Sequence, residues 1–136
     1  MSYLVDTCAV SELIKPQPSA SVFAWFRHAP AEALFVSVLT LGEIRKGVAS
    51  MPVGRRRERN AAWLRVDLPR WFEDRILPVG PGVADNWGRL AARVPNLPVA
   101  DGLIAATALH HQLAIVTRNE GDFAQTGVEI VNPWKQ

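Results

Sequence analysis

Short apolar runs alternate with helical segments along the whole chain, and this alternation restricts the possible folds more than any other feature. The helical segments show apolar residues at helical spacing and end near Pro or Gly. Strands that alternate with helices are typical of a parallel sheet with helices on both faces, so we expect an α/β/α sandwich. The expected strands span residues 2–7, 34–38, 76–79, 113–117 and 128–131, and the main helices residues 8–15, 21–29, 40–49, 55–74, 83–93 and 101–111.

Four acidic residues fall just after a strand-like run or just inside a helix: Asp6, Glu43, Asp101 and Asp122. In a parallel sheet the carboxyl ends of the strands lie on one edge, which is where such folds bind ligands. Carboxylates gathered there repel one another unless a cation lies among them, and Mg²⁺ prefers carboxylate oxygens and water. The pattern therefore indicates an acidic metal site.

Each of these acids also has an ordinary structural interpretation. Asp6 and Asp101 each precede a helical segment and can cap it, while Thr40 can cap the helix that carries Glu43. Glu43 can be a solvent-facing helix residue, and Asp122 lies in a stretch rich in turn formers. The joint position of the four acids on one edge, rather than any one of them, favours the metal site.

Length and composition limit the class of protein. The chain has 136 residues, which is enough for a single domain over residues 1–136 and too few for two. No apolar run approaches the roughly 20 residues that span a bilayer, and nothing at the N-terminus suggests secretion. A single cysteine, Cys8, excludes an internal disulfide framework and a cysteine-rich zinc site. We therefore expect a cytoplasmic protein that does not bind membranes.

The net charge of +2 conceals an uneven distribution. Setting the four acids aside leaves 9 of the 13 acidic residues against 15 Lys and Arg. A basic surface beside an acidic metal site suits a polyanionic substrate held by its phosphates, although a run of Arg can equally be a solvated face. The basic residues concerned are Arg45, Lys46, Arg55, Arg56, Arg57 and Arg59.

Aromatic residues offer a second kind of surface. Trp63 and Trp71 lie in the expected helix over residues 55–74, and Leu64 adds apolar area beside them. These side chains can cover a partner helix or stack on a nucleic-acid base. We favour a protein partner, because aromatic residues and Arg are enriched at such interfaces.

Several motifs, in this order along the chain, resemble the PIN-domain ribonucleases, and among them the VapC-type and FitB-type toxins of bacterial toxin–antitoxin pairs. The resemblance implies a PIN domain and a metal-dependent endoribonuclease that uses Mg²⁺, with Mn²⁺ as an alternative. It also implies neutralisation by a cognate antitoxin, a homodimer and a hetero-oligomer with the antitoxin. The motifs are LVDTCAVSE over residues 4–12, SVLTLGEIRKG over 37–47, ADGLIAATA over 100–108, VTRN over 116–119 followed by Asp122 and Phe123, and NPW over 132–134.

The resemblance also implies roles for single residues. Asp6, Glu43 and Asp101 match the first three metal-site acids of the family. Some relatives have an acid at the position of Asn119 and no Asp at the position of Asp122, so either residue can complete the site. Asp6 and Asp101 are expected to bind the metal directly, and Glu43 and Asp122 through water or a second ion.

Two threonines lie beside these acids. Thr7 matches a hydroxyl near the metal in the family, and Thr117 can play the same part. The resemblance assigns RNA hydrolysis to metal-activated water, and an open edge pocket suits single-stranded RNA better than a duplex.

Three other classes of protein compete with this interpretation. A catalytically silent PIN module that binds RNA or an antitoxin is the nearest rival, but idle carboxylates would only store repulsion. A phosphate-transfer receiver domain should have adjacent acids near the first strand and a late Lys, whereas this chain has Val5-Asp6 and Arg118. A haloacid-dehalogenase-type phosphatase needs Asp-x-Asp, which Asp6-Thr7-Cys8 lacks.

Overall fold

A computed structural model describes residues 1–135, so Gln136, the last residue of the predicted domain, lies outside the described residues. Five parallel strands form one sheet in the order β3-β2-β1-β4-β5. Tyr3 pairs with Leu34 on one side and with Ala114 on the other, so the two neighbours of β1 are level with it. The strands are β1 (Tyr3–Val5), β2 (Leu34–Ser37), β3 (Ile76–Leu77), β4 (Ala114–Val116) and β5 (Ile130–Val131).

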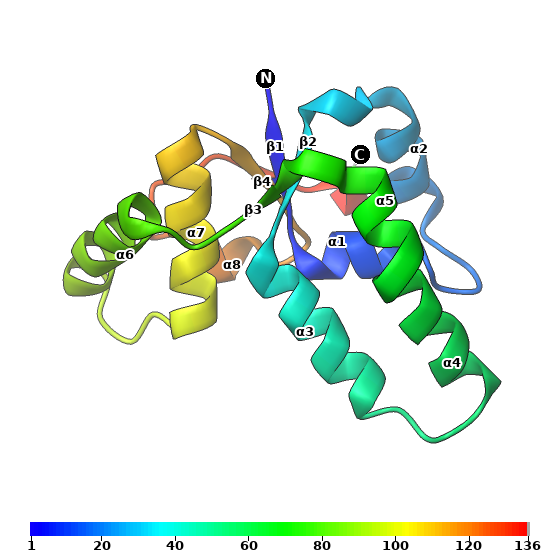
Figure 1. The fold of residues 1–136 in the computed structure, drawn as a ribbon. Coiled ribbons are helices and arrows are strands. Elements are labelled where there is room, and N and C mark those ends of the chain that lie inside the picture. Colours follow the sequence, from blue (N-terminus) through cyan, green and yellow to red (C-terminus); the bar gives the residue numbers. More distant parts are fainter. Residues whose placement is uncertain (136) are drawn as a thin grey trace.

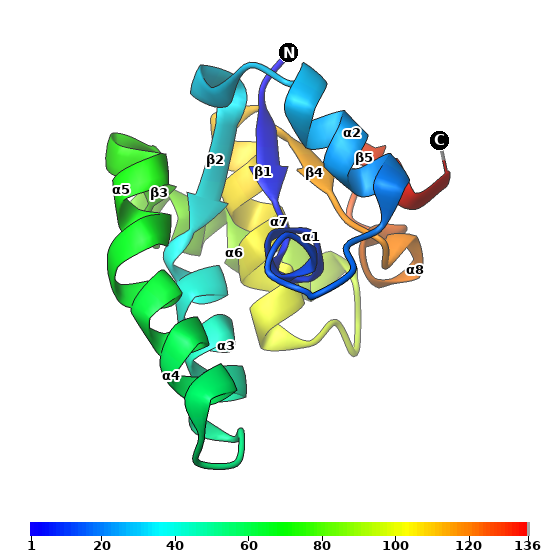
Figure 2. The same ribbon diagram turned by 90° about the vertical axis from the view of Figure 1, so that its right-hand side faces the viewer.

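Helices cover both faces of this sheet (Figures 1 and 2), which confirms the predicted α/β/α sandwich. The pair α6 and α7 covers one face, and α1 to α5 cover the other. None of the helices within residues 1–135 combines the length and the apolar character that crossing a membrane requires. The helices are α1 (Thr7–Glu12), α2 (Ala20–His28), α3 (Val38–Ala49), α4 (Arg55–Ala62), α5 (Leu68–Phe72), α6 (Pro81–Arg93), α7 (Val99–His111) and α8 (Glu120–Phe123).

Successive strand residues point to opposite faces and so build two cores. Val5 and Val116 pack with α1, α3 and α5 in one core, while Leu4 and Ile115 pack with α6 and α7 in the other. Because both faces are buried, the strands are continuous apolar runs without polar alternation. This explains why the sequence pattern identified them.

The expected helix over residues 55–74 is divided. A π-helical turn, Trp63–Asp67, separates α4 from α5, and α5 ends at Phe72. Pro69 is the second residue after the turn, and its ring nitrogen cannot donate a hydrogen bond to the preceding turn. The proline therefore coincides with a change in helix geometry rather than with a break in the helix.

The helix caps correct two predictions. Helix α3 is capped by Ser37, whose Oγ accepts from the Leu39 amide at 3.0 Å, and not by Thr40, which is buried inside the helix. Helix α7 begins at Val99 and its N-cap residue makes no side-chain hydrogen bond, so Asp101 is not a cap. Asp6 does cap α1, since its Oδ1 accepts from the Thr7 amide at 2.9 Å.

Candidate functional site

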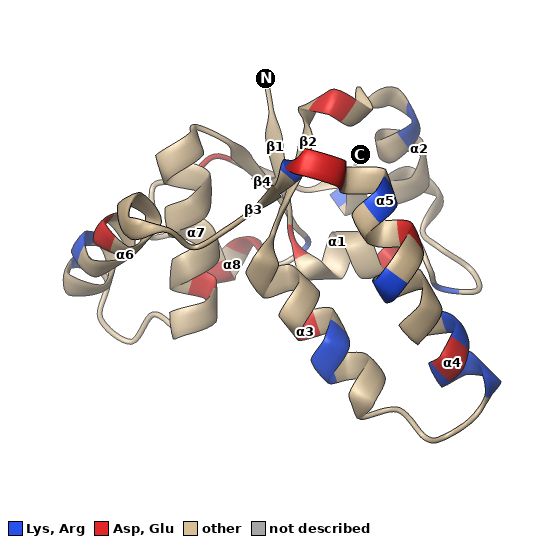
Figure 3. Cartoon of the chain, in the orientation of Figure 1, with Lys and Arg blue, Asp and Glu red and all other residues tan. Residues whose placement is uncertain are grey.

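The carboxyl edge of the sheet brings the four predicted acids together. Asp6 follows β1 directly, Asp101 lies in the first turn of α7, and the other two lie on α3 and α8 (Figure 3). Burial is the largest cause that raises the pKa of Asp101, and the charges of Asp122, Asp6 and Glu43 raise it further. The other three carboxylates are therefore close enough to Asp101 for their charges to act on it.

Within residues 1–135, no basic side chain forms an ion pair with these acids. Asp6 is only 7% exposed, yet its oxygens accept only from neutral donors. The ion pairs within residues 1–135 join Lys15 to Glu12, Arg89 to Asp85 and Lys135 to Glu120, so none involves the four acids. A buried carboxylate among like charges is costly unless a cation compensates it, which points to a cation from outside the chain.

Thr117 holds the most buried acid in place. Its Oγ1 is fully buried and donates to Asp6 Oδ2 at 2.8 Å, and it accepts from the Asn119 amide at 3.0 Å. The end of β4 is thereby fixed to the end of β1. The sequence predicted that Thr117 lies near the metal site, and in the structure its hydroxyl orients Asp6.

Thr7 orients Glu43 in the same way. Its Oγ1 donates to Glu43 Oε1 at 2.6 Å and lies 3.3 Å from the buried Thr40 hydroxyl. Glu43 is otherwise exposed, so this hydrogen bond turns an outward-facing helix residue toward the acidic edge. Sequence reasoning missed the contact with Thr40, because its position suggested a cap.

Cys8 is a second neighbour that the sequence did not assign to the site. The sequence favours a small buried packing residue, but Cys8 Sγ is only partly buried, lies 3.4 Å from Thr117 Oγ1 and accepts from the Arg118 amide at 3.5 Å. Burial is the largest cause that raises the pKa of this thiol. The protonated thiol donates to Asp6 Oδ2 at 3.7 Å and adds no negative charge to the site.

Asn119 and Asp122 differ in how they relate to the site. Asn119 contributes its backbone, since its amide donates to Thr117 and its carbonyl accepts from the Asp122 amide at 3.1 Å. The Asn119 side chain is exposed. The charge of Asp122, by contrast, contributes to the raised pKa of Asp101. These contacts favour Asp122 as the fourth acid.

We therefore expect Asp122→Ala to weaken Mn²⁺ binding about tenfold and Asn119→Ala to change it little, because only the first removes a charge from the cluster. Calorimetric titration of Mn²⁺ into both variants measures the difference. The opposite order would transfer the role to Asn119, and two unchanged affinities would remove the fourth ligand altogether.

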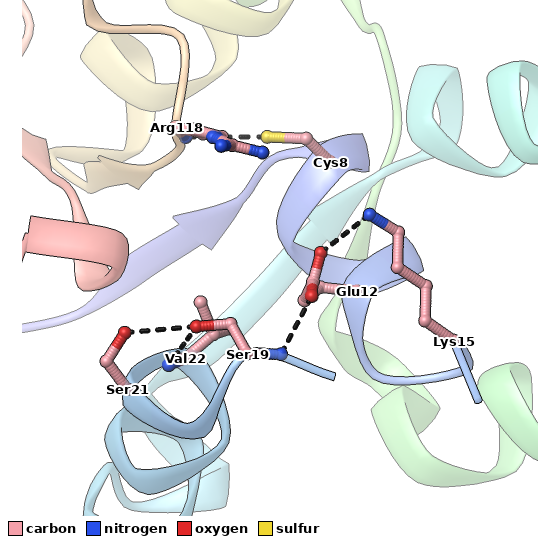
Figure 4. Close-up of polar contacts among 7 residues, drawn as sticks. All are labelled: Cys8, Glu12, Lys15, Ser19, Ser21, Val22 and Arg118. Carbon is pink, nitrogen blue, oxygen red and sulfur yellow. Dashed lines mark hydrogen bonds and ion pairs between the residues drawn. The ribbon is translucent and has the colours of Figure 1, made fainter. Parts of the chain in front are cut away.

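Glu12, the last residue of α1, joins the loop before α2 to Lys15 (Figure 4). It is buried, its Oε2 accepts from the Ser19 amide at 2.8 Å, and its Oε1 lies 2.9 Å from Lys15 Nζ. The hydrogen bond from Lys15 is the largest cause that lowers the pKa of Glu12. Glu12 thus ties the start of α2 to α1 and holds Lys15 beside the acidic edge, a role that no motif in the sequence indicated.

The predicted basic residues do not form one surface. Arg56 lines a cleft of about 380 Å³ that also includes Thr7, Glu43 and Lys15. Arg55 and Arg59 line a separate hollow of about 530 Å³ with Glu58 and Ala62. The remaining three, Arg45, Lys46 and Arg57, are accessible on α3 and α4.

Two of the three side chains predicted to bind a partner line an apolar groove. Trp63 and Trp71 line an apolar cavity of about 210 Å³ together with Leu13, Ile14 and Phe26. Trp71 is 46% exposed at its mouth. Leu64, however, is 7% exposed and packs in the core with Leu68 and Phe72, so it offers no surface to a partner.

The donor set fits a hydrated Mg²⁺ ion. Within residues 1–135, no three Asp, Glu, His or Cys side chains are gathered closely enough to enclose a metal. Mg²⁺ keeps several of its waters and commonly binds proteins through one or two carboxylates, so it does not require such a cage. Zinc requires three or four direct ligands and does not suit this arrangement.

The raised pKa of Asp101 predicts how the metal-free protein responds to pH. Between the ordinary value of 3.8 and the raised value, the folded chain binds more protons than the unfolded chain, so stability falls as pH rises through this window. We expect Asp101→Asn to stabilise the metal-free protein at pH 7 by less than about 1 kcal/mol, since the side chain is partly exposed.

Thermal unfolding in EDTA at pH 7 and at pH 3 measures this effect. The two proteins should differ at pH 7 and converge at pH 3, where both the folded and the unfolded Asp101 are protonated. A variant less stable than its parent at pH 7 would show that the carboxylates do not repel one another in the folded chain.

The parallel sheet and the acids at its carboxyl edge define a class of α/β domain whose site suits a hydrated divalent cation. Residues 3–129 match the PIN domain family, and the chain belongs to that family. It is 34% identical to the VapC ribonuclease Y4jK of Sinorhizobium fredii over 97% of each chain. It is also 34% identical to the toxin FitB of Neisseria gonorrhoeae over 96% of this chain and 97% of the relative.

A solved structure is equally similar. The crystal structure of FitAcB from Neisseria gonorrhoeae matches with a TM-score of 0.93 at 33% identity, over 98% of this chain and 99% of that chain. These comparisons confirm the predicted fold and the resemblance to the VapC-type and FitB-type proteins.

Proposed function

We propose that this protein is a Mg²⁺-dependent ribonuclease and the toxin of a toxin–antitoxin pair. The observation that carries the proposal is the gathering of Asp6, Glu43 and Asp122 around Asp101, whose pKa their charges raise, while none of the four forms an ion pair in the described chain. Relatives named as a VapC ribonuclease and as a toxin, similar over nearly the whole chain, support the class of activity. Cleavage of single-stranded RNA in Mg²⁺, and its loss in Asp101→Asn, tests the proposal.

The roles of the acids follow from their surroundings. Asp6 and Asp101 would hold the ion directly, since they are the least exposed of the four. Glu43 and Asp122 are exposed and would act through water. The bound ion supplies a water of lowered pKa and offsets the charge on the phosphate.

The remaining side chains keep this edge ordered. Thr117 and Thr7 hold Asp6 and Glu43 through their hydroxyl hydrogens, so the two acids face the ligand before it arrives. The three histidines make their contacts elsewhere than at the acidic edge. His28 bonds the Ala24 carbonyl, His110 bonds Asn86, and His111 lines a hollow with Met1 and Ser2. Proton transfer to or from the RNA is therefore assigned to water at the acidic edge.

An antitoxin is the proposed occupant of the apolar groove beside Trp63 and Trp71. The groove is lined by apolar side chains from α1, α2 and α5 and by one acid, Asp67. Such a surface suits the apolar face of a peptide segment that carries a positive charge at its edge. The homodimer remains a prediction from the resemblance.

A catalytically silent PIN module is the second candidate. It would have no need for the hydrogen bonds that Thr7 and Thr117 direct to Glu43 and Asp6. These contacts hold like charges near one another at a cost in stability, which selects against them in a protein that binds no cation.

A further inference from the structure

The cleft beside Glu43 combines an apolar floor with a cationic rim. It lies between α1, α3 and α4, and its inner end is formed by Thr7 and Glu43 of the acidic site. Its rim carries two basic side chains, Lys15 and Arg56. The apolar side chains of its floor are Ile14, Ile44, Val48 and Met51.

The two basic side chains of this rim are positioned differently. Lys15 lies 2.9 Å from Glu12, which is buried and bonded to the Ser19 amide, so this ion pair orients the partly exposed ammonium group (Figure 4). Arg56 is exposed and forms no ion pair within residues 1–135. Its guanidinium is therefore available to a phosphate without first breaking another contact.

The opposite side of the acidic site has a different chemistry. Asp101 and Asp122 line a second hollow of about 250 Å³, whose other polar side chains, Asn96, Gln125 and Thr126, are uncharged. Arg93 donates to the Gln125 and Thr126 carbonyls beside this hollow, but the charged side chains that line it are the two acids, so in the absence of a cation it is less favourable to a polyanion than the Lys15–Arg56 rim. A phosphate chain that crosses the acidic edge therefore has one favoured side.

We propose that the cleft is a nucleotide subsite for single-stranded RNA, adjacent to the phosphate that is cleaved. A neighbouring phosphate lies between Arg56 and Lys15, and the ribose and base of the same nucleotide cover the apolar floor. This assignment rests on the proposed ribonuclease function and adds to it the side from which the substrate is held. The phosphate of a nucleotide would meet the basic side chains, and its base would meet the apolar side chains.

Arg59 provides a matched control on the same helix. Arg56 and Arg59 are both exposed residues of α4, but Arg59 lines the hollow with Arg55 and Glu58 and is separated from the acidic edge. Arg56→Gln and Arg59→Gln remove the same charge from the same helix. Only the first removes it from the cleft.

The test measures binding of a fluorescein-labelled single-stranded RNA by anisotropy in EDTA, where no cleavage occurs, at several salt concentrations. We expect Arg56→Gln to weaken binding about tenfold and to reduce the slope of log K against log salt by about 0.7, the value for one phosphate contact on a single strand. Arg59→Gln should keep the affinity within about twofold of the parent and leave the slope unchanged. Thermal unfolding confirms that both variants are folded.

Equal effects of the two substitutions would overturn the subsite, because they would reflect the general charge of α4. Unchanged RNA binding by Arg56→Gln, with weakened antitoxin binding, would assign the cleft to the antitoxin and also overturn it. Cleavage by the parent protein in Mg²⁺ is measured separately. A parent that binds RNA through Arg56 but does not cleave it would refute the ribonuclease and leave the phosphate contact established.

Discussion

Replacement of Asp6 or Asp101 by Asn is expected to lower Mg²⁺-dependent cleavage of single-stranded RNA by about a thousandfold or more, since metal-ion catalysis contributes several kcal/mol and each 1.4 kcal/mol is a factor of ten. Asn has nearly the same shape, so the fold should persist. Asn at position 6 retains an oxygen that can accept from the Thr7 amide and cap α1. What is lost is the charge that holds the cation.

The measurement is the initial rate of cleavage by purified parent and variants in Mg²⁺, with EDTA as the metal-free reference. Asp85→Asn is the matched control, because Asp85 is an exposed acid on α6 that pairs with Arg89 far from the acidic edge. It should cleave at the rate of the parent. Full activity in both site variants would refute the metal site.

Trp71→Ala is expected to weaken binding of the antitoxin by about 2 kcal/mol, roughly thirtyfold, because buried aromatic anchors dominate the energy of such interfaces. Trp71 is the suitable probe, since it is 46% exposed at the mouth of the apolar groove. Trp63 also lines the groove but packs partly against the core, so its removal would disturb the fold as well.

Titration with the small protein encoded next to the toxin gene measures this affinity. Phe23→Ala is the control, since Phe23 is an aromatic residue of α2 that is 48% exposed and does not line the groove. Its removal should change the affinity little. Equal losses for the two variants would place the antitoxin elsewhere, and no loss for either would leave the groove without a partner.

The sequence predicted the sheet and the acidic edge because both depend on local order. Buried parallel strands are short apolar runs, and an acid that follows such a run reaches the carboxyl edge in any parallel sheet. Asp6 and Asp101 could be placed in this way without any knowledge of their neighbours. The alternative interpretation of Asp101 as a helix cap is wrong, since α7 begins two residues earlier, at Val99.

Contacts between distant segments could not be predicted in this way. The hydrogen bond from Thr117 to Asp6 joins residues far apart in the chain, and the bond that the Ser19 amide donates to Glu12 depends on how the loop before α2 turns back. The separation of Arg56 from Arg59 depends on which face of α4 packs against α3, and an arginine run contains no apolar residue to show it. Leu64 adjoins Trp63 in the sequence but faces the core with Leu68 and Phe72, so closeness in sequence misplaced it on the partner surface.

Ile14 lines both the apolar groove and the cleft beside Glu43, so the two cavities share one wall. A ligand in the groove would contact this side chain, which also lines the neighbouring cleft. A ligand whose binding displaced Ile14 would change the free energy of binding in the other cavity, and linkage would make the effect mutual. Inhibition by a partner would then not require any contact with the carboxylates, because a protein bound on one side of α1 reaches the RNA path through a single isoleucine.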